Sequence, residues 1–307
     1  MRRKIINHFL QIFLILSIVV CILGFSVHEK QKSLQQTENN KVIIAFIDSV
    51  CSTETKNFLA DVLWINEDEI VDNAVDDDNN GYIDDIHGWN YKKNKKDVFT
   101  ESEMNHGDYI LQTFANTMDE NDDKFDYEIM ILNVLGEDGE CSAIDLIQAV
   151  KYAESNGAKI CNLSLSTYSD NKVLKQVIKD SNMFFVVAAG NESENLDDGF
   201  PSYPTNYRFN NVISVAAVDE NDELLEISNY GKETVDVAAN GIIEHDDYII
   251  EGTSIATAKV TAVATKCYSS LTAEKASEEL KEDIISLAEK NKKLSEKTIS
   301  QGVIKEN

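Results

Sequence analysis

The chain has 307 residues, of which 54 are acidic and 28 basic, so its formal net charge at pH 7 is -26. Its length allows a sizeable core, and its composition is that of an ordinary globular protein. The acidic excess argues against a nucleic-acid partner, because phosphate binding needs a positive surface. A net charge of this size mainly affects solubility. Among possible partners, the negative charge favours metal ions and basic peptides.

The N-terminus has the pattern of an export segment. Residues 1–7 form a basic stretch that carries Arg2, Arg3 and Lys4, and residues 8–26 are mostly apolar. The length of this run lies between that of a signal-peptide core and that of a membrane span, so a cleaved signal peptide and an uncleaved membrane anchor both stay open. The basic stretch should remain in the cytoplasm. We therefore expect the rest of the chain outside the cell, either held on the cell membrane by this segment or secreted.

Residues 27–40 are polar and lack periodicity, which indicates a linker, and the folded domain is expected over residues 41–307. Short apolar runs in this domain predict buried strands at Val42–Ile47, Tyr127–Leu135, Lys159–Leu165, Phe184–Ala189 and Val212–Val218. Helical spacing predicts helices between Ser142 and Gly157, over Asn171–Asp180 and over Glu274–Lys297. Strands that alternate with helices predict an α/β fold, with a mainly parallel central sheet covered by helices on both faces.

The exported part contains Cys51, Cys141, Cys161 and Cys267. An oxidising compartment would permit disulfides between them. Their separation along the sequence shows no metal-binding pairs, and buried free thiols are an equally good interpretation.

Polar residues with chemical potential stand where strands end and helices start. Asp48 directly follows the first apolar run, His106 opens a helical pattern, Asn191 follows the strand at Phe184–Ala189, and Ser254 stands at another helix start. Histidine is the usual general base near neutral pH, and a helix N-terminus or a side-chain amide can stabilise an oxyanion. Taken alone, the serine is more often a helix cap, the histidine a surface residue, and the aspartate and asparagine turn residues. Together, the order Asp, His, Ser is that of one class of serine peptidase.

The chain resembles the subtilase family of serine peptidases from about Val42 to near the C-terminus. The matching segments are Val42–Asp48, His106-Gly107, Asn162–Leu165, Ala188–Glu192, Val212–Asp219, Ile227–Gly231, Asp236–Ala239 and Gly252–Ser254. The resemblance implies a subtilisin-like three-layer fold and an endopeptidase that hydrolyses peptide bonds through an acyl-enzyme.

The resemblance also assigns roles to individual residues. Asp48, His106 and Ser254 would form the catalytic triad, and Asn191 would contribute to the oxyanion hole. An extended peptide or protein substrate would pair with an edge strand made of Ser164, Leu165 and Ser166. A role in maturing one specific exported peptide is the narrower hypothesis, based on the N-terminal tether and on the absence of a long prodomain before the folded domain.

Several positions depart from the family pattern. Asp108 and Tyr109 replace the Thr and His that usually follow His-Gly, and we expect the Asp108 carboxylate to raise the pKa of His106. Val50 and Ser166 stand where the family has glycine. These departures motivate a rival interpretation, in which the chain is a catalytically inactive subtilase-like protein that binds peptides.

An acidic stretch at residues 76–85 follows the first nine positions of a helix-loop-helix calcium loop, with Gly81 at the sharp turn. The predicted oxygen ligands are Asp76, Asp78, Asn80 and Asp84. Position twelve is His87 and not glutamate, so a solvated acidic turn is the alternative. The calcium would be structural, and no redox or nucleotide cofactor is implied. A second rival interpretation is a calcium-dependent surface-binding module.

Overall fold

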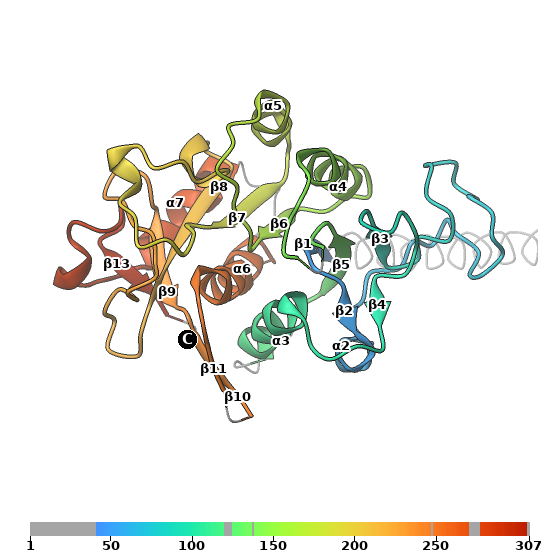
Figure 1. The fold of residues 1–307 in the computed structure, drawn as a ribbon, viewed down its shortest axis with the longest axis horizontal. Coiled ribbons are helices and arrows are strands. Elements are labelled where there is room, and N and C mark those ends of the chain that lie inside the picture. The colour runs from blue at the N-terminus through green and yellow to red at the C-terminus, as the bar shows by residue number, and fades with distance from the viewer. Residues whose placement is uncertain (1–40, 120–124, 137, 247, 270–276, 306–307) are drawn as a thin grey trace, which may run out of the picture. The chain divides into compact units, whose positions relative to one another are not determined.

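The computed structural model describes residues 41–119, 125–136, 138–246, 248–269 and 277–305 (Figure 1). The contacts within the chain divide it into two units, Met1–Lys41 and Val42–Asn307, and all elements described below belong to the second unit. The predicted export segment and linker lie outside the described residues, so both stay predictions. No helix in the described ranges combines the length and the apolar character that crossing a membrane requires.

A nine-stranded sheet forms the centre of the fold, in the order β12-β13-β9-β8-β7-β6-β1-β5-β3 (Figure 1). Neighbouring strands run parallel, except that β12 runs antiparallel to β13. The strands are β1 (Val42–Asp48), β3 (Gly88–Asn90), β5 (Tyr127–Asn133), β6 (Ile160–Leu163), β7 (Phe184–Ala188), β8 (Val212–Val218), β9 (Val237–Asn240), β12 (Glu289–Lys290) and β13 (Gly302–Ile304). All five strands predicted from apolar runs are present, and the other four strands of this sheet, which sequence reasoning missed, are only two to four residues long.

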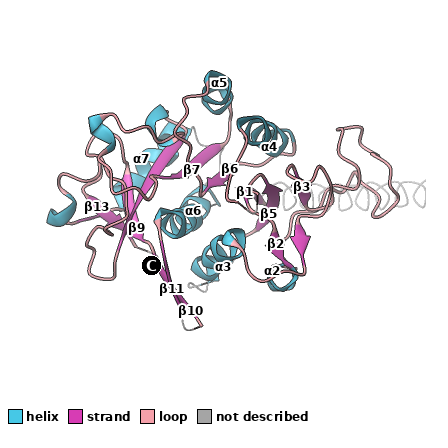
Figure 2. Cartoon of the chain, in the orientation of Figure 1, coloured by secondary structure: helices cyan, strands magenta, loops and turns pink. Residues whose placement is uncertain are grey.

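Helices cover both faces of the sheet, as Figure 2 shows. On one face lie α3 (His106–Asp119), α6 (Thr253–Ser269) and α7 (Ser277–Leu287), and on the other lie α4 (Ala143–Ser155) and α5 (Lys172–Asp180). The Ser142 hydroxyl caps α4 by accepting from the backbone N–H of Asp145, and the Asn171 side chain caps α5. The predicted three-layer α/β class is confirmed.

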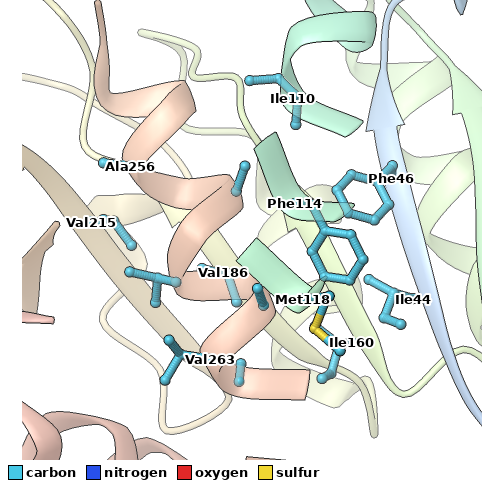
Figure 3. Close-up of a cluster of buried hydrophobic side chains, with 14 of the residues drawn as sticks. Ile44, Phe46, Ile110, Phe114, Met118, Ile160, Val186, Val215, Ala256 and Val263 are labelled. Atoms are coloured by element: carbon cyan, nitrogen blue, oxygen red, sulfur yellow. The ribbon is translucent and has the colours of Figure 1, made fainter. Parts of the chain in front are cut away.

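The side chains of β1 alternate between two hydrophobic clusters. Ile44 and Phe46 point to the α3 and α6 face, and Ala45 and Ile47 point to the α4 face. Figure 3 shows the first cluster, in which the rings of Phe46 and Phe114 meet edge to face with centroids 5.0 Å apart. Full burial of a side chain of this size stabilises the fold by about 1.5–3 kcal/mol. This packing fixes α3 against the end of β1.

Smaller elements surround the sheet. They are β2 (Cys51–Ser52) paired with β4 (Phe99–Thr100), α2 (Thr53–Phe58), the hairpin of β10 (Ile242–His245) and β11 (Tyr248–Glu251), and 3-10 turns at Leu196–Asp198, Thr205–Tyr207 and Lys292–Leu294. Cys51, Cys141 and Cys161 are not in disulfides. Burial raises the pKa of the Cys51 and Cys161 thiols, which makes them poor nucleophiles.

The predicted terminal helix over Glu274–Lys297 is wrong in its extent, because the helix in this region ends at Leu287. The chain then turns so that β12 pairs with β13 and Leu294 becomes fully buried. Burial of Leu294 in the cluster beside β9 and β13 outweighs the helical pattern of the exposed residues around it.

Candidate active site

Asp48 and His106 form a direct pair at the carboxyl end of β1. The Nδ1 atom of His106 lies 2.7 Å from Oδ1 of Asp48, and Ser49 donates its backbone N–H to the same oxygen at 2.7 Å. The carboxylate is buried while the imidazole is 43% exposed. Because the carboxylate accepts, the proton lies on Nδ1, and Nε2 is left as the basic nitrogen. The negative charge of Asp48 raises the pKa of His106, and partial desolvation of the ring opposes it.

The start of α3 sits close to the segment that follows β1. The backbone N–H of Gly107 donates to Ser49 Oγ at 2.8 Å. A Cβ at position 107 would come within 2.9 Å of the Ser49 carbonyl oxygen, which no real side chain tolerates without a shift. The glycine beside His106 is therefore required by close approach of two backbones. Sequence reasoning missed the partner of this contact, Ser49.

The prediction that Asp108 raises the pKa of His106 is wrong. The Asp108 carboxylate is fully buried and accepts from the backbone N–H and hydroxyl of Ser52, at 2.7 and 2.8 Å, and from the Asn105 backbone N–H at 2.6 Å. Asp108 thus satisfies the N-terminus of α3 and ties it to β2. The charge that acts on the imidazole is that of Asp48.

Ser254 lies in the first turn of α6, directly after Gly252 and Thr253. Its hydroxyl donates to the backbone carbonyl of Ser164 at 3.0 Å, and the Ser164 hydroxyl donates to the backbone carbonyl of Ser254 at 3.1 Å. The Ser254 hydroxyl makes no hydrogen bond to His106 in this conformation. Hydrogen bonds of this kind are often formed only when substrate is bound.

The Asn191 side chain is anchored on the segment that leads into α6. Its Oδ1 accepts from the backbone N–H of Thr253 at 2.9 Å and from the Thr253 hydroxyl at 3.0 Å. With the oxygen held in this way, the Nδ2 group makes no hydrogen bond to the described residues, and Asn191 is exposed. A donor that is fixed in orientation and has no partner suits a developing negative charge.

The predicted substrate segment borders a cavity of about 600 Å³. Leu165 and Ser166 follow the end of β6 and make no backbone hydrogen bond within the described part of the chain, so their N–H and C=O groups are available to an extended peptide. The cavity lies beside His106, and its largest apolar lining residues are Leu135, Leu146, Leu165 and Leu174.

The four predicted calcium ligands do not converge on one point. Asp84 pairs with Lys96 at 3.1 Å, and Asp76 accepts the backbone N–H groups of Asn80 and Gly81. Asn80 directs its amide nitrogen at Asp78, with 2.9 Å between Nδ2 and Oδ2. Residues 59–105 are all described, and no helix flanks the acidic stretch, so the helix-loop-helix motif is absent there.

Instead, Asp78 joins Glu69 and Asp85, and carboxylate oxygens of these three residues lie within 4.8 Å of one another. Glu69 and Asp85 are buried. No lysine or arginine pairs with any of the three in the described part of the chain. Tyr152 of α4 donates to Asp85 at 2.5 Å across a long separation in sequence, which no local pattern could have indicated.

The parallel sheet, its two helix layers and the Asp48–His106 pair define a protein of the subtilisin type. The family model described as "Subtilase family" matches residues 18–302, and the chain belongs to this family. The M-protease of Shouchella clausii (strain KSM-K16) is 34% identical over 145 residues, which are 45% of this chain and 37% of that protein. The chain thus spans less than half the length of this relative.

Two solved structures share the fold. A lanthipeptide protease has a TM-score of 0.63 and 18% identity, with 86% of this chain and 85% of that chain covered. The prenylagaramide maturation protease PagA has a TM-score of 0.60 and 18% identity, with 87% and 91% covered. At these identities the likeness concerns the fold.

Proposed function

We propose that this chain is a subtilisin-like serine endopeptidase, with Asp48, His106 and Ser254 as its triad. The observation that carries this proposal is the 2.7 Å contact between Asp48 and His106, which leaves Nε2 of the imidazole free to act as a base. Family membership over most of the chain supports it.

In the proposed reaction, the Ser254 hydroxyl leaves the Ser164 carbonyl and donates its proton to Nε2 of His106. The serine oxygen attacks the carbonyl carbon of the scissile peptide bond. The Nδ2 group of Asn191 and the backbone N–H of Ser254 then donate to the oxyanion. Protonated His106 gives its proton to the leaving amine, which leaves an acyl-enzyme on Ser254. Water, deprotonated by His106, then attacks the ester carbonyl, and protonated His106 returns the proton to Ser254 Oγ as the acid product is released.

The substrate is proposed to be an extended peptide or protein segment that pairs with Ser164, Leu165 and Ser166 through its main chain. The apolar cavity beside this segment favours a bulky apolar side chain on the amino-terminal side of the cut. Maturation of one exported peptide is the narrower proposal. Two proteases that share the fold bear names of this kind, a lanthipeptide protease and a prenylagaramide maturation protease.

Calcium is proposed as a structural ion held by Glu69, Asp78 and Asp85. Three carboxylates this close repel one another, and the donors that they have, such as Asn66 and Tyr152, are neutral and offset only part of the cost of desolvation. When bound, calcium would supply the positive charge that offsets both costs. Attachment to the cell membrane by residues 8–26, or secretion after their removal, stays part of the proposal.

Labelling with a fluorophosphonate probe tests the peptidase proposal. We expect the exported domain to react, and both Ser254→Ala and His106→Ala to abolish the reaction. The comparison is made with and without added calcium. Absence of labelling in a folded, calcium-supplemented wild type would favour the inactive peptide binder, an alternative suggested by the bond between the Ser254 hydroxyl and the Ser164 carbonyl.

A further inference from the structure

Two buried oxygen atoms, one of them in the proposed triad, have no hydrogen-bond donor among the described residues. They are Oδ2 of Asp48 and Oδ1 of Asn133. Asp48 is 3% exposed and Asn133 2%. Both donors to Asp48, His106 and the Ser49 backbone, use its other oxygen. A buried acceptor without a donor is rare and costly, and a charged one especially so.

The two residues are direct neighbours in the sheet. In the parallel register of β1 and β5, Asp48 pairs with Asn133, and Phe46 pairs with Ile131 two residues earlier. Phe46 and Ile131 belong to the hydrophobic cluster on the α3 and α6 face. Because side chains alternate along a strand, Asp48 and Asn133 point to that same face. Neighbouring strands lie about 4.8 Å apart, which places the two side chains within reach of each other.

A single rotation removes both unpartnered oxygens. Oδ1 is the atom of the Asn133 amide that is buried without a partner, and the NH₂ group donates to no described residue, so turning the amide over breaks no hydrogen bond. The oxygen and the NH₂ group have nearly the same size, so either fits the buried position. We propose that Asn133 is a positioning residue whose NH₂ group donates to Oδ2 of Asp48. The proposal rests on the triad proposed above.

With this bond, each oxygen of the Asp48 carboxylate has a donor. Asn133 would then hold the carboxylate plane that orients His106, and it would disperse part of the negative charge that acts on the imidazole. Asp48 is the charge that raises the pKa of His106, since the Asp108 carboxylate is turned to Ser52 and Asn105.

Asn133→Leu tests this role, because leucine keeps the branched shape and removes the donor. The negative charge of Asp48 should then act more strongly on the imidazole, so the pKa of His106 should rise by about 0.5–1 unit. The pKa is measured by NMR of the labelled imidazole and by the acid limb of kcat/KM. We expect KM on the pH plateau to stay unchanged.

Asn211→Leu is the matched control. Asn211 is also buried, and its amide donates to the Ile178 carbonyl at 2.7 Å, before the start of β8. This variant should lower stability and leave the pKa of His106 as it is. Equal pKa values in wild type and Asn133→Leu would overturn the proposal.

A crystal structure of the wild type gives an answer that needs neither variant folding nor activity. We expect about 2.7–3.2 Å between Asn133 Nδ2 and Asp48 Oδ2. A water molecule between the two side chains, or an amide nitrogen that faces away from Asp48, would contradict the inference. A wild type that forms this contact and hydrolyses no peptide would instead refute the proposed function alone.

Discussion

Ser164 and Ser254 bind each other twice, each hydroxyl donating to the other residue's backbone carbonyl, at 3.1 and 3.0 Å. These two hydrogen bonds join the end of β6 to the first turn of α6, two segments that are distant in the sequence. It sets the distance between the proposed nucleophile and the proposed substrate segment. The Ser164 hydroxyl also accepts from the buried amide of Asn162 at 3.0 Å.

Ser164→Ala is therefore expected to destabilise the fold. The substitution removes one bond to Ser254 and leaves the Asn162 NH₂ group buried without an acceptor, at a cost of about 1–3 kcal/mol. Urea unfolding of the Ser254→Ala background measures this without self-cleavage. Ser166→Ala is the control, because the Ser166 hydroxyl makes no hydrogen bond within the described chain.

The activity should rise with pH through the pKa of His106, because the reaction needs a neutral imidazole. That pKa is raised by Asp48. Asp48→Asn should move the acid limb of kcat/KM to lower pH and reduce kcat by about 10⁴. The contribution of His106 to the stability of the fold changes with pH in the opposite direction to the activity. The raised pKa stabilises the fold fully below the unfolded value of about 6.5, and this contribution is lost as the pH rises through the folded pKa. An acid limb that stays in place in Asp48→Asn would contradict this account.

Gly107→Ala should reduce activity by displacing the start of α3. The added methyl group would lie 2.9 Å from the Ser49 carbonyl oxygen and 3.2 Å from the Cys51 sulfur. Relief of such overpacking costs about 1–3 kcal/mol and shifts His106 away from Asp48. Thermal unfolding and kcat report the two effects separately. Wild-type values of both would show that the contact is looser than described.

Asn191→Ala should lower kcat by about 10²–10³ and leave KM nearly unchanged, because the lost donor acts on the oxyanion and not on the bound peptide. Steady-state kinetics with a chromogenic peptide measures both constants. Asn221→Ala serves as the comparison, since Asn221 is an exposed turn residue bonded to Asp219. A loss confined to KM would assign Asn191 to substrate binding.

Calcium at about 100 times its dissociation constant should stabilise the wild type by about 2.7 kcal/mol. This stabilisation is seen as a rise in Tm, and Asp78→Asn and Asp85→Asn should each abolish that rise. Asp76→Asn should retain it, because Asp76 lies outside the cluster of three carboxylates and binds backbone N–H groups. Calorimetry with calcium and with a chelator gives the comparison. A response lost only in Asp76→Asn would restore the ligand set predicted from the sequence.

The places of Asp48, His106, Asn191 and Ser254 along the chain could be predicted from local sequence patterns. Each stands at the end of an apolar run or at the start of a helical pattern. Such patterns involve only neighbouring residues, so they can be recognised without knowledge of the fold. The five main strands and both helices of the α4 and α5 layer followed from the same kind of signal.

Which side chains meet depends on the three-dimensional packing of the chain and could not be predicted from local patterns. Asp108 turns to Ser52 and not to His106, Asp85 reaches Tyr152, and Asn133 comes to lie beside Asp48. These contacts join residues dozens of positions apart, and they depend on strand register and on the packing of helices against the sheet. The residue spacing of a calcium loop carries no information on strand register or on helix packing. Burial and hydrogen-bond donors from distant parts of the chain determine which carboxylates come close to one another.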